Sequence, residues 1–301
     1  WDNHPNFNAN KIFASQLEDV FRVNVRPYKP NIKKIDASKN EQEYIYETLE
    51  IDFDGDGISE QTEIRGRFLD ENELIFTNEK PYVIYGYAAV GNGDELIIEE
   101  GSRIHFHDNS GLIITNGGSI KANGEFSQNQ GLENEIIFEG DRLEPFFENI
   151  PGQWGTIWLL EGSVDNEFSF CTIKNASVGI YTTGGANYDD FKLDLLNVQI
   201  YNSSNFGILS LSSSIDAQNL VINKSGQSSF AGTYGGKYKL NHCTISNFWN
   251  SGIRQFPSVL FNDFFIDSEN NEYVNELFDV DISNSIIYGN QNIEFLVENL
   301  S

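Results

Sequence analysis

Short apolar runs, separated by clusters of Gly, Asn, Asp and Ser, follow one another along most of the chain. Such runs predict short β-strands, because the separating residues are the ones that form turns. The strand pattern begins near Thr48 and is clearest at residues 96–98, 112–114, 136–138 and 157–160. Helical spacing of apolar residues is nearly absent, and its best example, residues 14–22, predicts only one short helix. The pattern therefore predicts an all-β protein.

The runs also repeat, and a fixed period of 20 to 50 residues indicates a repeat architecture. Residues 170–175, 197–202, 219–224 and 242–247 share one pattern, residues 284–290 carry a looser copy, and the equivalent apolar positions are Ile173, Ile200, Ile222 and Ile245. These isoleucines are 27, 22 and 23 residues apart. A coil of that length cannot close a core alone, but stacked coils pair in parallel and bury one continuous apolar column. We therefore predict a right-handed parallel β-helix, also called a β-solenoid.

The two cysteines provide a check on this alignment. One slot of the repeat is occupied in turn by Cys171, Val198, Leu220 and Cys243. The two sulfurs should then lie three rungs apart, on the order of 14 Å, which is too far for a disulfide. Both cysteines are therefore expected to be buried free thiols. Asn recurs at the corners of the coils, where it tolerates left-handed backbone and can ladder its side-chain amides between coils.

The chain is predicted to divide at about residue 73. Residues 73–301 are expected to form the β-helix, and residues 1–72 an N-terminal lead-in or cap segment. Solenoids need caps because an open terminal rung exposes unpaired backbone groups. Ile245 and the next equivalent position, Ile287, are 42 residues apart, so one coil carries a long insertion around residues 255–275. Such insertions fall on loops, often on the functional side.

The charge balance excludes one class of partner. The chain has 19 Lys and Arg against 45 Asp and Glu, a formal net charge of −26. A polyanion would be repelled, so no nucleic-acid partner is expected. The 301 residues include 23 Phe and 13 Tyr, too much apolar surface for a disordered acidic chain. No apolar run approaches the roughly 18 residues of a membrane span, and any signal segment is expected to have been removed before Trp1.

The most distinctive local motif is the acidic stretch at residues 52–63. Oxygen ligands at its positions 1, 3, 5, 9 and 12, a Gly at position 6 and a backbone carbonyl at position 7 are what a calcium loop needs. The corresponding ligands are Asp52, Asp54, Asp56, Ile58, Glu60 and Glu63. The motif resembles the calcium loops of thrombospondin type 3 repeats, but its flanks alternate like strands. Calcium binding and a merely acidic β-hairpin turn both stay open.

Two groups of large side chains are candidates for ligand binding. Trp154, which precedes Gly155, and Trp158 could present an aromatic platform to a sugar ring. Trp249 and Arg254 lie near the coil at 242–247, beside the aromatic-rich insertion. The alternative is packing, in which Trp154 covers the core where the coil turns and Gly155 allows a close approach of the next rung. We favour packing over binding at both places.

No complete catalytic set is evident. β-Helix lyases use a basic residue with calcium, and hydrolases use clustered Asp residues. The repeats carry one adjacent Asp pair, Asp189 and Asp190, and few basic residues. His105 and His107 lie on one face of a strand and could bind a metal, but no third ligand is nearby in the sequence, so a structural role is expected. We predict no catalytic residue.

Six stretches of the chain resemble the right-handed β-helix lipoproteins of Bacteroidota. They are residues 80–85, 139–144, 151–155, 159–163, 242–249 and 286–290, and the resemblance covers about residues 75–300. It implies a mature lipoprotein held in the outer membrane by a lipid anchor on a Cys upstream of Trp1. The family provides no activity that could be transferred.

The leading hypothesis is a non-catalytic cell-surface lipoprotein that binds other proteins or glycans as a subunit of an outer-membrane complex. One alternative is a polysaccharide lyase or glycoside hydrolase of β-helix fold, and another is a calcium-stabilised adhesin. An exposed cleft with converging carboxylates would favour the enzyme, and a broad apolar patch would favour a protein partner.

Overall fold

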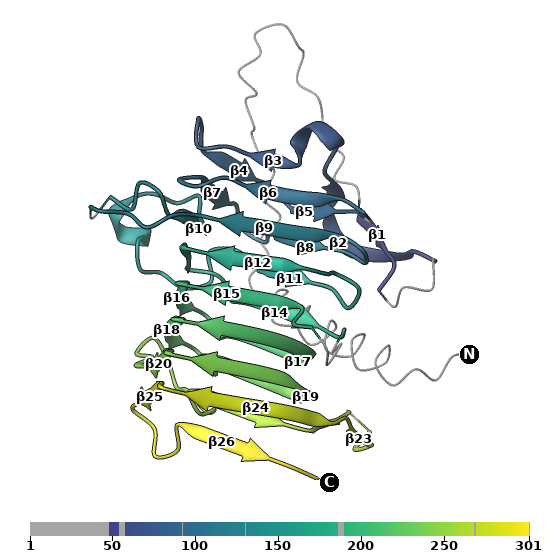
Figure 1. Ribbon diagram of the computed structural model, residues 1–301, viewed down its shortest axis with the longest axis vertical. Coiled ribbons are helices and arrows are strands. Elements are labelled where there is room, and N and C mark those ends of the chain that lie inside the picture. The colour runs from purple at the N-terminus through teal and green to yellow at the C-terminus, as the bar shows by residue number, and fades with distance from the viewer. Residues whose placement is uncertain are drawn as a thin grey trace, which may run out of the picture.

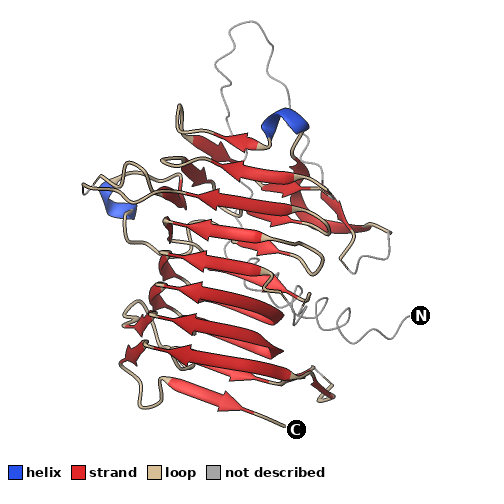
Figure 2. Cartoon of the chain, viewed as in Figure 1, coloured by secondary structure: helices blue, strands red, loops and turns tan. Residues whose placement is uncertain are grey.

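The computed structural model describes residues 48–53, 58–91, 93–129, 131–185, 190–267 and 269–300. Apart from two single-turn 3₁₀ helices, η1 (Glu71–Glu73) and η2 (Pro145–Phe147), the regular elements in these ranges are strands (Figure 2). The strands stack along the long axis of the molecule, and most pair in parallel (Figure 1). The predicted all-β parallel β-helix is confirmed.

Each full coil contributes a strand to each of three parallel sheets, which we name PB1, PB2 and PB3. PB1 contains β2 (Glu60–Phe68), β5 (Tyr87–Val90), β8 (Gly111–Ile114), β11 (Ile157–Leu159), β14 (Val178–Thr183), the first halves of β17 (Phe206–Gln218) and β19 (Phe230–Asn241), β21 (Val259–Asn262) and β26 (Phe295–Glu298). PB2 contains β3 (Ile75–Phe76), β6 (Glu95–Ile98), β9 (Ser119–Asn123), β12 (Asn166–Ser169), β15 (Leu193–Leu196), the second halves of β17 and β19, and β24 (Leu277–Ser283). PB3 contains β4 (Tyr82–Ile84), β7 (Arg103–Phe106), β10 (Ile136–Gly140), β13 (Cys171–Lys174), β16 (Gln199–Ser203), β18 (Val221–Ser225), β20 (Thr244–Asn247) and β25 (Ile286–Gly289).

Alternate residues of the three sheets point inward and form one apolar column. On PB3 the inward position is held in register by Ile104, Phe138, Ile173, Ile200, Ile222, Ile245 and Ile287. All of these except Ile287, which is in the last rung, are at most 1% exposed. The alignment made on the isoleucines is therefore confirmed, and the core is continuous from rung to rung.

The corner between PB2 and PB3 is the same in five consecutive rungs. Its residues have positive φ angles of 48–56° and are Phe170, Asn197, Asn219, His242 and Asn284. Asn tolerates this left-handed conformation better than most residues. The side chains also ladder, because Asn219 Nδ2 donates to Asn197 Oδ1 at 2.7 Å. The expected role of Asn at the corners is confirmed.

Both cysteines are buried free thiols, in the same slot and three rungs apart, as predicted. Burial raises the pKa of the Cys171 and Cys243 thiols. Since the thiolate is the reactive form, we expect neither cysteine to react with Ellman's reagent in the native protein at pH 8, and both to react after unfolding in urea. Reaction of either thiol before unfolding would contradict this.

The solenoid starts earlier than the predicted boundary at residue 73. Residues 66–68 of β2 already pair in parallel with β5, whereas the first half of β2 pairs antiparallel with β1 (Thr48–Ile51). The strand β2 therefore belongs to a hairpin and to PB1 at once. Residues 1–47 of the predicted lead-in, including the helix expected at 14–22, lie outside the described residues.

The insertion expected at residues 255–275 is an insertion only in part. Within it, β21 is a regular PB1 strand between β19 and β26, and its Val259 and Phe261 continue the buried column. The segment that leaves the coil is an antiparallel hairpin of β22 (Phe264–Ile266) and β23 (Glu272–Val274). The packing favoured for the insertion is confirmed, because Phe265 and Tyr273 pack against the outer face of PB1.

The outer face of PB1 is apolar and buried as well. Val178, Tyr181 and Leu209 on this face are at most 1% exposed. Leu49 and Ile51 of β1 belong to the same apolar cluster. Much of PB1 is thus covered on both sides, which leaves PB2 and PB3 as the sheets with side chains available to a ligand.

Candidate functional site

The predicted calcium loop joins β1 to β2. Its ligands Asp54 and Asp56 lie outside the described residues. Ile58 is exposed, and Glu60 and Glu63 lie within β2. Because side chains alternate along a strand, Glu60 and Glu63 point to opposite faces of β2 rather than toward one ion. The antiparallel pairing of β1 with β2 also agrees with the hairpin alternative.

Calcium at this loop stays a prediction, and it has a direct test. A bound ion would stabilise the folded chain by mass action, so the melting temperature should rise when calcium replaces EDTA. A melting temperature that calcium does not change would contradict the prediction.

The candidate ligand-binding role of Trp154 is wrong, and the packing role that we favoured is confirmed. Its side chain is 1% exposed and stacks on Phe106 in the core, with ring centroids 4.2 Å apart. Its Nε1 donates to the carbonyl of Lys174 at 2.9 Å. A side-chain carbon at the adjacent Gly155 would lie 2.9 Å from the carbonyl oxygen of Ser110 in the neighbouring rung, so the close approach expected at this glycine is confirmed. Trp154 covers the core and offers no ring face to a sugar.

Trp158 and Arg254 are also unavailable, whereas Trp249 stays a candidate. Trp158 is 8% exposed on the outer face of PB1, where it stacks on Tyr181 at 5.2 Å. Arg254 is 4% exposed and donates to both carboxylate oxygens of Glu294, at 2.8 and 2.6 Å. The candidate ligand-binding role of these two residues is wrong, because both are buried and Arg254 forms an internal ion pair. Trp249 is half-buried beside Gly226.

Both histidines lie near carboxylates that were not predicted from the sequence, and among these only the His107–Asp141 pair is hydrogen-bonded. On the outer side of PB3, His107 Nδ1 lies 2.7 Å from Asp141 Oδ2, and His105 Nδ1 lies 3.6 Å from Glu139 Oε1. Glu139 is also paired with Lys174, at 2.6 Å. Among the described residues, no three or more His, Cys, Asp or Glu side chains are grouped so that they could hold a metal ion. The pairs fit the structural role expected for the histidines.

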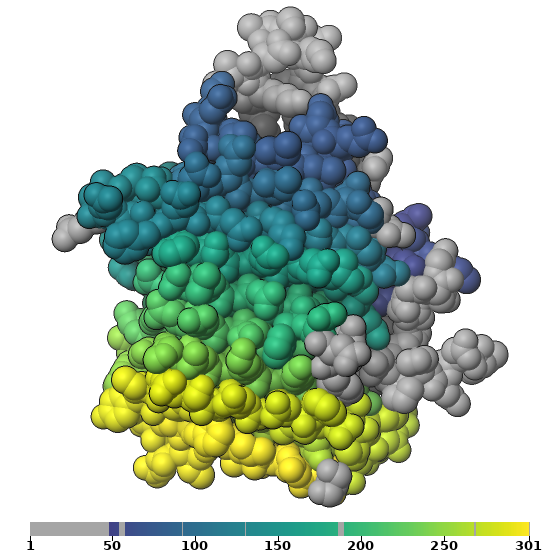
Figure 3. All heavy atoms as spheres, in the orientation of Figure 1, coloured from purple at the N-terminus to yellow at the C-terminus, as the bar shows by residue number. Residues whose placement is uncertain are grey.

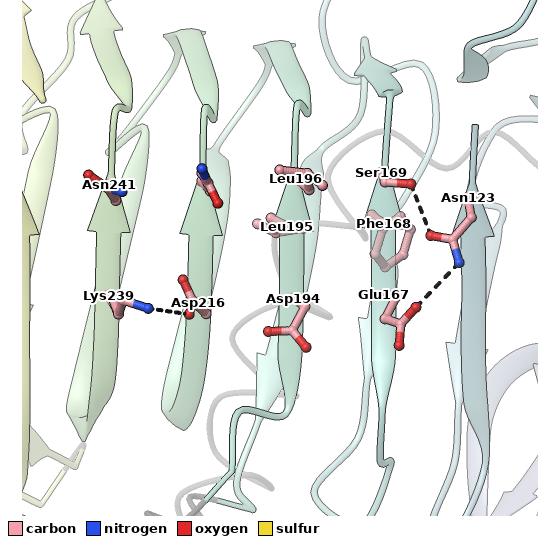
Figure 4. A pocket seen from close by; sticks show the side chains of 11 residues that line it. Asn123, Glu167, Phe168, Ser169, Asp194, Leu195, Leu196, Asp216, Lys239 and Asn241 are labelled. Atoms are coloured by element: carbon pink, nitrogen blue, oxygen red, sulfur yellow. Dashed lines mark hydrogen bonds and ion pairs between the residues drawn. The ribbon is translucent and has the colours of Figure 1, made fainter. Parts of the chain in front are cut away.

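The outward side of PB2 carries two in-register ladders of side chains. The charged ladder consists, in rung order, of Lys121, Glu167, Asp194, Asp216, Lys239 and Asp281. Two positions further along each strand, the second ladder consists of Asn123, Ser169, Leu196, Gln218 and Asn241. Successive rungs are ~4.8 Å apart. The second ladder and the four middle members of the charged ladder line a groove of about 360 Å³ that runs across five neighbouring strands (Figure 4).

At both ends of this groove the charged side chains form ion pairs, and the carboxylate in the middle does not. Glu167 accepts from Lys121 at 2.6 Å, and Asp216 accepts from Lys239 at 2.7 Å. The Lys121 hydrogen bond lowers the pKa of Glu167. Asp194 lies between these pairs, is exposed, and has no ion-pair partner among the described residues (Figure 4). Partial burial of its carboxylate and the negative charges of Asp216 and Glu167 raise the pKa of Asp194.

This groove was not predicted from the sequence, although the sequence carries a signal for it. Glu167, Asp194, Asp216 and Lys239 are separated by 27, 22 and 23 residues. These are the intervals between the repeated isoleucines, so the same alignment places all four side chains in one slot of the repeat. Of the Asp pair noted in the sequence, Asp189 lies outside the described residues, and the acidic groups that gather on PB2 come from different coils.

Comparison with models of known protein families, with curated proteins and with solved structures finds no match for this chain. The site must therefore be interpreted from its own geometry and charges.

Proposed function

We propose that the protein is a non-catalytic cell-surface protein that binds a glycan in the groove on PB2. The observation that carries the proposal is the pair of in-register ladders, which places exposed polar side chains at every rung along the groove. A linear polymer lying along the solenoid axis would meet the same kinds of groups at regular steps of ~4.8 Å.

The chemistry of the ladders suits a sugar polymer. Carboxylates accept hydrogen bonds, and the amides of Asn123, Gln218 and Asn241 both donate and accept them, as sugar hydroxyl groups do. Leu196, which is 42% exposed, adds an apolar contact for the C–H face of a ring. Because the chain carries a net charge of −26 and Asp194 is unpaired in the groove, the ligand is a neutral or amine-bearing glycan rather than a polyuronate.

The cellular setting of the proposal rests on the lipoprotein resemblance alone. On the basis of that resemblance, the proposed protein is a lipid-anchored component of an outer-membrane complex at the cell surface. No helix in the described ranges is long and apolar enough to cross a bilayer.

Replacing Asp194 with Asn tests the binding function. The change keeps the shape of the side chain and removes the unpaired charge, so affinity for an amine-bearing polysaccharide should fall about tenfold or more, while the urea unfolding midpoint should not fall, because the raised pKa of Asp194 shows that its charge does not stabilise the fold. Calorimetric titration of wild type and variant with chitosan oligomers and with a neutral glucan measures this. The matched control is Glu79→Gln, an exposed carboxylate outside the groove. Absence of binding to every polysaccharide tested, or equal binding by D194N, would contradict the proposal.

A hydrolase is the second candidate, and one observation favours it. Glycosidases use two neighbouring carboxyl groups, one of which has a raised pKa and acts as the general acid. Asp194 lies beside Glu167 and Asp216 on the neighbouring strands, and its pKa is raised by partial desolvation and by their charges. If the groove is catalytic, wild type should release reducing ends from a polysaccharide, and D194N should lose about 100-fold or more of that rate. Binding without release would support the non-catalytic function.

A further inference from the structure

The groove on PB2 contains three carboxylates, and the two outer ones are paired with lysines. The groove lies on the face that Figure 3 shows, because the PB2 strands β12, β15 and β24 are in front in Figure 1. Lys121 donates to Glu167 at 2.6 Å, and Lys239 donates to Asp216 at 2.7 Å. Asn123 Nδ2 donates to the second carboxylate oxygen of Glu167, at 3.3 Å. Both outer carboxylates therefore have a counter-charge before any ligand binds.

The third carboxylate, that of Asp194, provides one position for a cation. It lies in register between Glu167 and Asp216 and has no ion-pair partner among the described residues (Figure 4). Partial burial and the charges of Asp216 and Glu167 raise its pKa. An ammonium group bound at Asp194 would relieve this repulsion, so a cation is more favourable here than elsewhere in the groove.

The side chains beside Asp194 suit neutral sugar units. Two residues further along the same strand, Leu196 is exposed, and its register neighbours are Ser169 and Gln218. None of these side chains carries a charge. A sugar unit with its amine at Asp194 could place its C–H face over Leu196, and the units on either side would meet hydroxyl and amide groups.

We propose that Lys121 and Lys239 determine the specificity of the groove, which binds a glycan with an isolated free amine among neutral units rather than a polycation. This inference rests on the proposed glycan-binding function. The free amine is bound at Asp194, and the two lysines prevent Glu167 and Asp216 from binding further amines. The ligand is an amino-sugar polymer with most of its amines acylated, because acylation removes the charge of an amine and leaves groups that form hydrogen bonds.

Three five-unit oligomers of glucosamine test this specificity. One is fully N-acetylated, one has a single free amine on its central unit, and one has free amines on all units. Calorimetric titration at pH 6 in 0.15 M salt screens long-range attraction to the acidic protein. The single amine should raise the affinity about tenfold, and the further amines should add less than about threefold. In Asp194→Asn the effect of the single amine should disappear, while the neutral oligomer should bind as it does to wild type.

Removing one of the lysines should increase the affinity for the polycation. In Lys239→Met the Asp216 carboxylate loses its counter-charge, so the fully deacetylated oligomer should bind about threefold or more tighter than it binds wild type. Lys121→Met should act in the same way through Glu167, and neither variant should change the affinity for the neutral oligomer. The matched control Lys80→Met removes an exposed lysine outside the groove and should change neither affinity. An increase in affinity cannot result from unfolding.

Three results would overturn the proposal. The first is a fully deacetylated oligomer that binds wild type more than about threefold tighter than the oligomer with one amine. The second is equal binding of this oligomer by K239M and K80M. In both cases, binding of the neutral oligomer would still support the glycan-binding function. The third is the absence of binding by all three oligomers, and the glycan-binding function would then depend on the result with the neutral glucan.

Discussion

Replacing Glu294 with Gln is expected to lower the free energy of unfolding by about 3–5 kcal/mol, the usual cost of removing one partner of a buried ion pair. The Glu294 carboxylate accepts two hydrogen bonds from Arg254 and one from Ser258 Oγ at 2.6 Å. In E294Q the Arg254 guanidinium, whose side chain is 2% exposed, keeps its charge in the interior without a counter-charge. Urea denaturation at pH 7 measures the loss.

An exposed ion pair of the same type provides the control. Arg67 and Glu73 also form two hydrogen bonds, both at 2.6 Å, but their side chains are 56% and 35% exposed. Solvent screens such a pair, so Glu73→Gln should cost less than about 1 kcal/mol. If E294Q costs no more than E73Q, the Arg254 pair does not stabilise the last coils.

Acid should remove the stabilisation that the ion pair between Arg254 and Glu294 provides. Burial alone would raise the pKa of Glu294, but the hydrogen bonds from Arg254 and Ser258 outweigh it and hold the pKa below its ordinary value of 4.5. A carboxyl group with a lowered pKa in the folded state stabilises the protein above its unfolded pKa, and this contribution is lost as the pH falls through the folded pKa. The difference in unfolding free energy between wild type and E294Q should therefore shrink below pH 4.5.

The fold was predictable from the sequence because every coil obeys the same local rules. The slot held by Ile173, Ile200 and Ile222 must be apolar in each coil, since a polar side chain there would be buried in the column. The corner at Asn197 and Asn219 must accept left-handed backbone. These demands repeat at each coil, and they appear in the sequence as a period.

Some of the residues considered for the site belong to the repeat, and others do not. The charged ladder on PB2 has the period of the isoleucines, so the repeat alignment was sufficient to find Asp194. Arg254 lies in a non-repeating loop, and its partner Glu294 is 40 residues away. Nothing local in the sequence shows that Arg254 points inward, and for that reason it was retained as a ligand-binding candidate although it forms a structural ion pair.

Raising the pH from 7 to 9.5 is expected to stabilise wild type by about 3 kcal/mol relative to a Lys192→Met variant. The Lys192 ammonium is buried at the corner between PB1 and PB2. It donates to the carbonyl of Leu160, to that of Glu161 at 2.9 Å and to that of Thr183 at 2.7 Å. Burial lowers the pKa of Lys192 to about 7 from an ordinary value of 10.5, although the charge of Glu161 offsets part of the effect.

The direction of this pH effect follows from proton counting. Between pH 7 and 10.5, the unfolded chain keeps the proton on Lys192 while the folded chain has lost it. Because the unfolded state binds more protons in this window, the free energy of unfolding rises with pH. Below pH 7 both states are protonated, and the full cost of the buried charge is present. K192M has no amine at this position. The difference in unfolding free energy between the two proteins therefore reports the titration of Lys192 alone, because the tyrosines and cysteines contribute equally to both.

A second lysine provides the matched control. Lys239 is exposed, and its hydrogen bond to Asp216 raises the pKa of the ammonium. It stays protonated in both states between pH 7 and 9.5, so Lys239→Met should differ from wild type by a constant amount over this range. Urea denaturation of the three proteins at pH 7, 8.5 and 9.5 gives the comparison. If the wild-type and K192M curves are parallel, the surrounding backbone carbonyls keep Lys192 charged at neutral pH, and the corner contains an ammonium rather than a neutral amine.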